Sequence, residues 1–229
     1  KSEIGLDASR LADGTLEIKT LNLETGVLGV QGNLELAADG LPNRFSLQGG
    51  ITSDQPVRLP SSGAPITVGG LQLSAAFDTA QSDAWSADIS LRELDHEALK
   101  VPSMQLVGSG TIDRSFGKQV TADVTYAASD LAFSDVKFAN TFDGAQSGQV
   151  VVNWSDGSDV VFEALKIVTD TVQVLASGTL GTVTDGFPLT GAATAEVNDF
   201  SRFSEIASRN LKGSGAVEIE GRFDVLGGG

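Results

Sequence analysis

Alternation between apolar and polar residues runs through nearly the whole chain and limits its fold more than any other feature. Leu16 and Ile18, for example, alternate with the charged residues Glu17 and Lys19. Side chains two residues apart lie on the same face of a β-strand, so each alternating segment predicts a half-buried strand. The clearest segments cover residues 30–36, 71–77, 85–91, 106–112, 150–154, 172–180 and 217–225. We expect about a dozen strands of roughly 8 to 11 residues, separated by turns rich in Gly, Asp, Asn, Ser and Pro.

A glycine followed two residues later by an aliphatic residue recurs along the chain. The glycines are Gly32, Gly110, Gly148, Gly178 and Gly215, with Gly70 as a degenerate member because Gln72 takes the place of the aliphatic residue. Most of their spacings are about 38 residues, and repetition at a fixed period is typical of stacked, quasi-one-dimensional architectures. We therefore interpret residues 1–229 as one repetitive β-sheet region, with each of these glycines near the start of a strand.

Two segments, 130–142 and 199–211, interrupt the alternation. Each opens with an aspartate that is a suitable helix N-cap, Asp130 in the first and Asp199 in the second. Each then places aromatic residues at helical spacing before a glycine-rich return to alternation. The sequence predicts short helices near 131–140 and 200–209, which serve as caps or crossovers at a sheet edge.

Composition excludes several classes of function. Thirty Asp and Glu against 15 Lys and Arg give a net charge of −15, which is unsuited to nucleic acid or to an anionic membrane surface. Cysteine is absent and histidine occurs once, which excludes cysteine nucleophiles and cysteine-based metal sites. We predict no enzymatic activity, no cofactor and no metal.

Several residues could in principle take part in catalysis, metal binding or sugar binding, but a structural role explains each of them more simply. His96 has no nucleophile or orienting partner nearby in the sequence, so we expect an exposed loop histidine. Asp156 and Asp159 lack the spacing of a calcium loop and indicate a hairpin turn. The aromatic residues Trp85, Trp154 and Phe187 are expected to anchor the core rather than to stack on sugars.

A sheet with one apolar face must either bury that face against another layer or bind an apolar ligand on it. Two short helices cannot cover a dozen strands, so the sheet either folds onto itself as a sandwich or barrel, or lines an open groove. The apolar rows contain many small residues, such as Gly178, Gly191 and Ala193, which would leave voids in a sealed core. In an open groove the same residues leave room for acyl chains, although glycine also permits bends where a sheet curls.

The phrases "VQVLASGTLGTVTDGFPLTGAATAEV" and "VNDFSRFSEIASRNLKGSGAVEIEGRF" give the chain a family resemblance. A strand ending in "SGTL", an acidic turn, another strand, an aspartate with spaced aromatics and then "LKGSG" is similar to the periplasmic region of the TamB family. This family is the inner-membrane-anchored half of the translocation and assembly module and belongs to the AsmA-like, bridge-like lipid transporters. The resemblance is best over 130–225, and over 15–128 it extends only to the general pattern of strands and turns.

The resemblance implies a long β-sheet that is curled into an open trough with an apolar interior. It also implies a periplasmic location, an inner-membrane anchor outside this chain and an outer-membrane partner of the BamA-like barrel type. The expected role is phospholipid transport between the two membranes, with support of outer-membrane protein assembly. Because the chain starts without Met and ends in three glycines, we interpret it as an interior fragment, whose free edges would self-associate by strand pairing.

We expect phospholipid acyl chains to contact apolar residues that share the inward side of their strands. The candidate groove residues are Leu106, Ile112, Val150, Val152, Val172, Val174, Leu180, Val217 and Ile219. Two alternatives remain open at this stage: an adhesin-type or passenger-type β-solenoid, and a polysaccharide-binding or polysaccharide-active β domain.

Overall fold

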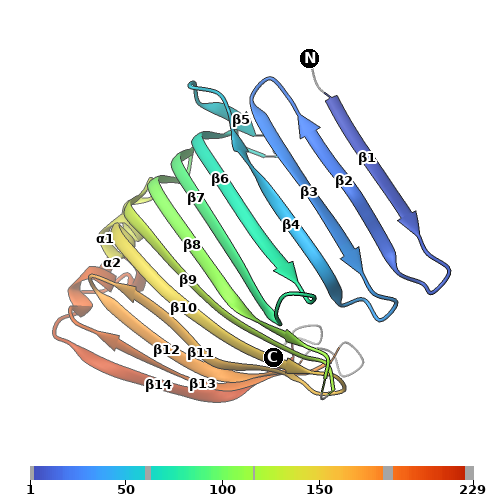
Figure 1. Ribbon diagram of the computed structural model, residues 1–229. Coiled ribbons are helices and arrows are strands. Elements are labelled where there is room, and N and C mark those ends of the chain that lie inside the picture. Colours follow the sequence, from blue (N-terminus) through green and yellow to red (C-terminus); the bar gives the residue numbers. More distant parts are fainter. Residues whose placement is uncertain (1–2, 60–62, 116, 183–187, 225–229) are drawn as a thin grey trace.

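A single antiparallel β-sheet forms almost the whole molecule (Figure 1). The computed structural model describes residues 3–59, 63–115, 117–182 and 188–224. Its fourteen strands form one sheet that curls without closing, and two short helical segments accompany it, so the predicted all-β fold is confirmed. The strands are β1 (Glu3–Arg10), β2 (Leu16–Glu24), β3 (Leu28–Leu36), β4 (Pro42–Ile51), β5 (Val57–Leu59), β6 (Ile66–Asp78), β7 (Ala84–His96), β8 (Leu99–Asp113), β9 (Gln119–Phe133), β10 (Gly144–Ser155), β11 (Val160–Thr169), β12 (Val172–Leu180), β13 (Pro188–Val197) and β14 (Gly215–Asp224).

The strands follow one another in the sheet in chain order, and only β5 lies off this path, paired with β6. Such a meander needs only local hairpin turns, which the turn-forming residues between the alternating segments supply. The central strands β8 and β9 have 15 residues each and exceed the predicted length. The recurring glycines do not mark strand starts as expected: Gly32 and Gly148 lie within β3 and β10, and Gly215 alone begins a strand.

A line of unusual backbone conformations runs across strands β6 to β9, where the regular pairing is interrupted. Glu93 in β7 has φ +54° and Asp130 in β9 has φ +47°, values that side-chain-bearing residues rarely adopt. The Glu93 side chain lies over Gly69 of β6, where a Cβ would collide with it. At this line the alternation of buried and exposed residues in β7 is interrupted. Leu91 and Leu94 are both partly buried, whereas Arg92 and Glu93 between them are exposed. The alternation therefore shifts by one residue at this line while the same face stays apolar.

The first helix, α1 (Val136–Phe142), joins β9 to β10 and begins later than predicted. Asp130 is not its N-cap, because β9 continues through Phe133 and Asp130 lies inside that strand. Asp135 caps the helix instead, accepting a hydrogen bond from the Lys137 backbone N–H at 2.8 Å. The alternation of β9 therefore extends the strand past the position where the sequence predicted its end.

The second helical segment joins β13 to β14. It consists of the 3₁₀ helix η2 (Phe200–Phe203) and the single turn α2 (Ser204–Ala207). Asp199 caps η2 as expected, with its carboxylate accepting from the Ser201 N–H at 2.9 Å. Hydrogen bonding from Ser201, through its side chain first and its backbone N–H second, lowers the pKa of Asp199 below its ordinary value.

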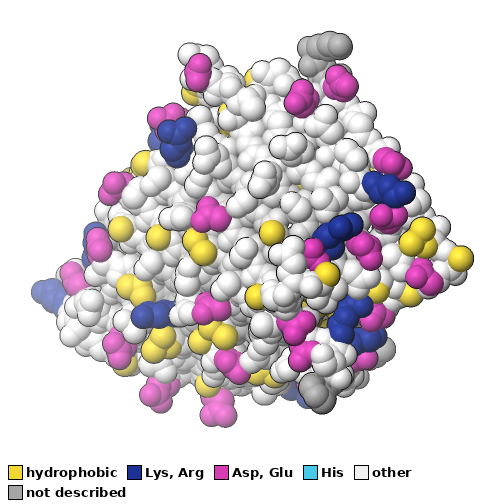
Figure 2. Space-filling view, in the orientation of Figure 1, with side chains coloured by type: hydrophobic (Ala, Val, Ile, Leu, Met, Phe, Trp, Pro, Cys, Tyr) yellow, Lys and Arg dark blue, Asp and Glu magenta, His cyan; other side chains and the backbone are white. Residues whose placement is uncertain are grey.

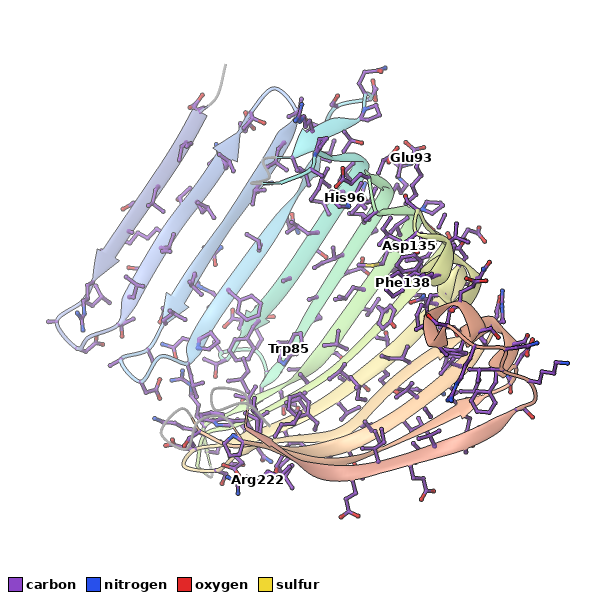
Figure 3. All side chains as sticks on the ribbon, turned by 180° about the vertical axis from the view of Figure 1, so that it is seen from behind. Trp85, Glu93, His96, Asp135, Phe138 and Arg222 are labelled. Atoms are coloured by element: carbon purple, nitrogen blue, oxygen red, sulfur yellow. The ribbon has the colours of Figure 1, made fainter. Side chains whose placement is uncertain are left out.

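An aromatic cluster holds the two helical segments together at one end of the strands, here called the helical end. Phe142 lies 6.4 Å from Phe133 of β9 and 6.1 Å, edge to face, from Phe203 (centroid distances). The buried Thr141 hydroxyl donates to the Arg202 carbonyl at 2.7 Å, and Arg202 Nη1 donates to the Thr171 hydroxyl at 2.8 Å. Figure 3 shows Phe138, Asp135, His96 and Glu93 at this end, and Trp85 and Arg222 at the other.

Charged side chains tie distant turns together at the opposite end, here called the Trp85 end. Arg114, in the β8–β9 turn, donates to the Leu41 carbonyl at 2.6 Å and lies 3.5 Å from Asp39 in the β3–β4 turn. Lys118 lies 3.5 Å from Asp39 and 3.7 Å from Asp156 of the β10–β11 turn. Hydrogen bonding from the Leu41 N–H, with help from the two cations, lowers the pKa of Asp39. Three hairpins that are far apart in the sequence therefore meet at this end.

We expect Arg114→Ala to lower the free energy of unfolding by about 1 to 3 kcal/mol, because the change removes charged hydrogen bonds to partly buried carbonyls. Urea denaturation followed by circular dichroism measures this loss. Arg209→Ala, at an exposed position, serves as the control and should change stability by less than about 0.5 kcal/mol. Equal effects of the two variants would show that the turns do not depend on Arg114.

The first and last strands of the sheet expose large apolar residues. Ile4 of β1 is 74% exposed and Ile219 of β14 is 67% exposed, since each has a neighbouring strand on one side only. Among the described residues, no helix has the length and apolar character that crossing a membrane requires.

Candidate functional site

Two uninterrupted apolar rows cross the sheet from β1 to β14. Directly paired residues lie on the same face, so the strand register defines each row. The first row is Ile4, Leu23, Val30, Gly49, Leu73, Ile89, Leu106, Tyr126, Gly148, Ile167, Val174, Ala195 and Val217. The second is Leu6, Leu21, Gly32, Leu47, Ala75, Ala87, Gly108, Val124, Val150, Leu165, Ala176, Ala193 and Ile219. Neither row contains a charge, and each spans about 58 Å at the usual strand spacing of about 4.8 Å.

These rows are not sealed inside the molecule. Most of their residues are only partly buried, and in the described part of the chain no second sheet packs over them. The fully shielded apolar side chains instead lie toward the strand ends, as with Val68 and Val101 beside the line of unusual conformations, and Phe77 and Ile112 at the Trp85 end. The middle of the apolar face therefore remains accessible.

Over β11–β14 the apolar face is hollowed to about 520 Å³. The side chains and glycines that line the hollow on this face are Phe162, Leu165, Ala176, Gly178, Leu189, Gly191, Ala193, Ile219 and Gly221. Gly178, Gly191 and Gly221 are direct neighbours in adjacent strands and leave the backbone bare. A volume of this size is typical of sites for small apolar ligands.

The glycines of the hollow have different origins. A Cβ at Gly178 would collide with the Thr190 carbonyl, and one at Gly191 would collide with the Ser177 carbonyl. Close approach of β12 and β13 therefore requires these two glycines. Gly221 has no atom within 4 Å of a Cβ position, so a side chain would fit there and would fill the hollow. Both explanations of the small residues, backbone curvature and free space, apply to this face.

The predicted groove residues all lie on the apolar face. Leu106, Val174 and Val217 belong to the first row, and Val150 and Ile219 belong to the second. The remaining candidates extend the face toward the strand ends. Val152 pairs with Phe162, Ile112 with Val120, Leu180 with Leu189, and Val172 with Val197.

Sequence analysis missed the residues that shape the hollow, notably Phe162, Leu165 and Gly221. Phe162 and Leu165 are three residues apart and both reach the same face, because a register shift lies between them in the pairing of β11 with β12. Strict period-two alternation places them on opposite faces, so the pattern alone gave no signal for this pair.

The other chemically interesting residues have structural surroundings. His96 lies in β7 rather than in a loop, and its Nδ1 accepts from the Ala98 N–H at 3.2 Å. Trp85 lies on the apolar face and donates from Nε1 to the Thr121 carbonyl at 3.0 Å. Asp156 lies in the β10–β11 turn, and Phe187 lies outside the described residues. Within the described ranges, acidic and histidine side chains form no cluster that would hold a metal ion.

Tyr126 is the titratable side chain of the first apolar row. It is the single tyrosine of the chain, and burial raises its pKa above the ordinary value, since burial disfavours the charged phenolate. A raised folded-state pKa contributes stability below the pKa of the unfolded chain, about 10, and this contribution is lost as the pH rises through the folded pKa.

We expect the phenolate absorbance of Tyr126 to appear at higher pH in the folded protein than in the urea-unfolded chain. A fatty acid bound on the apolar face should move the titration to still higher pH, because the acyl chain displaces water from the ring. Spectrophotometric titration with and without oleate measures both shifts. An oleate-independent titration would show that acyl chains do not reach Tyr126.

No family model, curated protein or solved structure matches the chain.

Proposed function

We propose that the apolar face of this sheet carries phospholipid acyl chains. The observation that supports this most directly is the pair of uninterrupted apolar rows, which stay partly exposed across all strands of the path. A soluble protein ordinarily covers such a face, because large exposed apolar patches mark sites of interaction. Here the small residues of β12–β14 add a hollow in which an acyl chain fits beside the backbone.

The energetic requirement of lipid transfer matches this surface. A two-chain lipid has on the order of 30 methylenes, each costing roughly 0.8 kcal/mol to expose to water, so crossing the aqueous space costs on the order of 20 kcal/mol. A continuous apolar face offsets much of this cost, because the acyl chains stay in contact with apolar side chains all along the sheet. It requires no catalytic group, and the acidic, polar opposite face keeps the sheet soluble.

The proposed context is that of the TamB-like and AsmA-like lipid transporters. In that context the chain is a periplasmic segment of an inner-membrane-anchored protein that works with a BamA-like barrel. It would conduct phospholipids between the membranes and thereby support outer-membrane protein assembly. The single, curled, unclosed sheet is the shape that this proposal requires.

The strand pairing disfavours the adhesin-type alternative. Every pair of neighbouring strands is antiparallel, whereas the rungs of a β-solenoid stack in parallel register. A coiled solenoid also seals its apolar residues inside the coil, and this meander leaves one face open.

Val174→Asp tests the function in cells. The new carboxylate lies in the first row between Ile167 and Ala195, where it should block acyl chains. An uncompensated charge in an apolar contact costs several kcal/mol, so transfer should slow by orders of magnitude while the protein still accumulates. Lipid composition of the outer membrane and resistance to detergents, measured in a strain lacking the wild-type protein, report the outcome.

Leu175→Asp is the matched control, because Leu175 is the next residue of β12 but faces the opposite side and is 46% exposed. It should support full function. Loss of function in both variants at normal protein levels, or in neither, would contradict transport along the apolar face.

Gly221→Leu tests the hollow in vitro. The leucine should occupy space that an acyl chain needs, and its Cβ would have no atom of the protein within 4 Å. Displacing about two methylenes costs roughly 1.6 kcal/mol, so the Kd for a fluorescent fatty acid should rise about tenfold or more. Glu220→Leu adds the same side chain to the opposite face of β14 and should leave the Kd unchanged. Equal affinity of both variants would mean that fatty acids bind elsewhere.

A further inference from the structure

A second hollow, of about 570 Å³, lies on the opposite, polar face of the sheet over β2, β3, β4 and β6. It exists because Gly29 and Gly50 face each other in adjacent strands and leave the backbone bare between longer side chains. Figure 2 shows acidic and basic side chains scattered among uncharged side chains and backbone over the face in view. The hollow is therefore separate from the apolar face both in position and in chemistry.

Four carboxamide side chains surround this hollow. Asn22, Gln31 and Gln48 are direct neighbours in β2, β3 and β4, and Gln72 lies beside Gly50 in β6. In the described part of the chain none of the four side chains makes a hydrogen bond to protein.

Three carboxamides elsewhere on the same face do have protein partners. Gln149 donates to Asp123 at 2.8 Å, Gln105 donates to Asp88 at 3.2 Å, and Asn43 donates to Glu35 at 2.9 Å. The four amides around the hollow therefore keep donors and acceptors that no described protein group uses, next to the bare backbone of Gly29 and Gly50.

We propose that this hollow binds an uncharged β-linked glycan. A carboxamide donates and accepts at once, which matches sugar hydroxyls and N-acetyl groups, and it carries no charge to match an ion. The amides of Asn22, Gln31 and Gln48 repeat at the strand spacing of about 4.8 Å, close to the advance per sugar of an extended β-linked chain. A periodic row of this kind suits a periodic polymer that lies across the strands.

The two acidic side chains at the hollow favour a neutral glycan over an anionic one. Glu24 and Asp88 are the charged residues that line it, and no Lys or Arg is among its described lining residues. Polyanions such as uronate polymers would therefore be repelled. Because no aromatic side chain is among the described residues that line the hollow, each sugar contributes little and binding should require several consecutive sugars.

Gly29→Val tests the proposal without damaging the fold. A Cβ at Gly29 meets only the Thr52 methyl, at an ordinary contact distance of 3.7 Å, and valine favours strands more than glycine does. The melting temperature should hold or rise while the hollow is filled. Ala127→Val adds bulk at an exposed position of β9 on the same face, outside the hollow, and serves as the control.

The measurement is an NMR titration of the wild-type protein and both variants with cellohexaose and chitohexaose at millimolar concentration. We expect saturable shifts in the side-chain amides of Asn22, Gln31 and Gln48, an at least tenfold weaker response in Gly29→Val, and wild-type behaviour in Ala127→Val. Absence of saturable shifts for both glycans would overturn the proposal. Equal binding by Gly29→Val, or equally strong binding of polygalacturonate, would also overturn it. The test does not depend on the apolar face, so its failure leaves the proposed lipid function untouched.

Discussion

The strand register is the constraint on which the rest of this structure depends. Each strand alternates apolar and polar side chains, so a slip of one residue between neighbours would transfer a whole apolar set to the polar face. The observed pairing avoids such a slip at every step from Ile4 in β1 to Val217 in β14. Backbone hydrogen bonds thus turn local alternation into a surface with two chemically distinct sides, each continuous across the sheet.

The ends of the strands stabilise the fold, whereas the middle of the apolar face stays accessible. At the helical end, α1, η2 and α2 cover the sheet through the Phe142 cluster and the bonds among Thr141, Arg202 and Thr171. At the Trp85 end, Arg114 and Lys118 join three turns. Fully buried apolar side chains gather at these ends, which provide ordinary core packing. The middle of the apolar face is thereby free to remain accessible.

Much of the fold followed from the sequence, because alternation is a local property that determines strand direction and face. Val174 and Ile219 were placed on one face by parity alone, and the register agrees. Predictions from the alternation were wrong where the backbone departs from regular strand geometry. Asp130 was expected to cap a helix, yet it adopts a left-handed conformation inside β9, at a point where the pairing with β8 and with β10 is interrupted.

Contacts between distant turns were also beyond the sequence. Nothing in the pattern around Asp39 and Arg114 indicates that the curl of the sheet brings them together. The polar hollow was missed for a similar reason: it depends on Gly29 facing Gly50, which only the register reveals. These failures share one cause, since each feature arises from how strands are placed beside one another rather than from any single strand.

The central claim is that the apolar face is open and takes acyl chains while the opposite face does not. Paramagnetic relaxation from a spin-labelled stearate, read from valine and leucine methyl signals, tests this most directly. Val30, Val124, Val150 and Val174 lie in the apolar rows, whereas Val107 and Leu175 lie on the polar face as internal controls. Strong broadening confined to the first set is the predicted result. Equal broadening of both sets, or none at a saturating stearate concentration, would contradict an open, acyl-binding face.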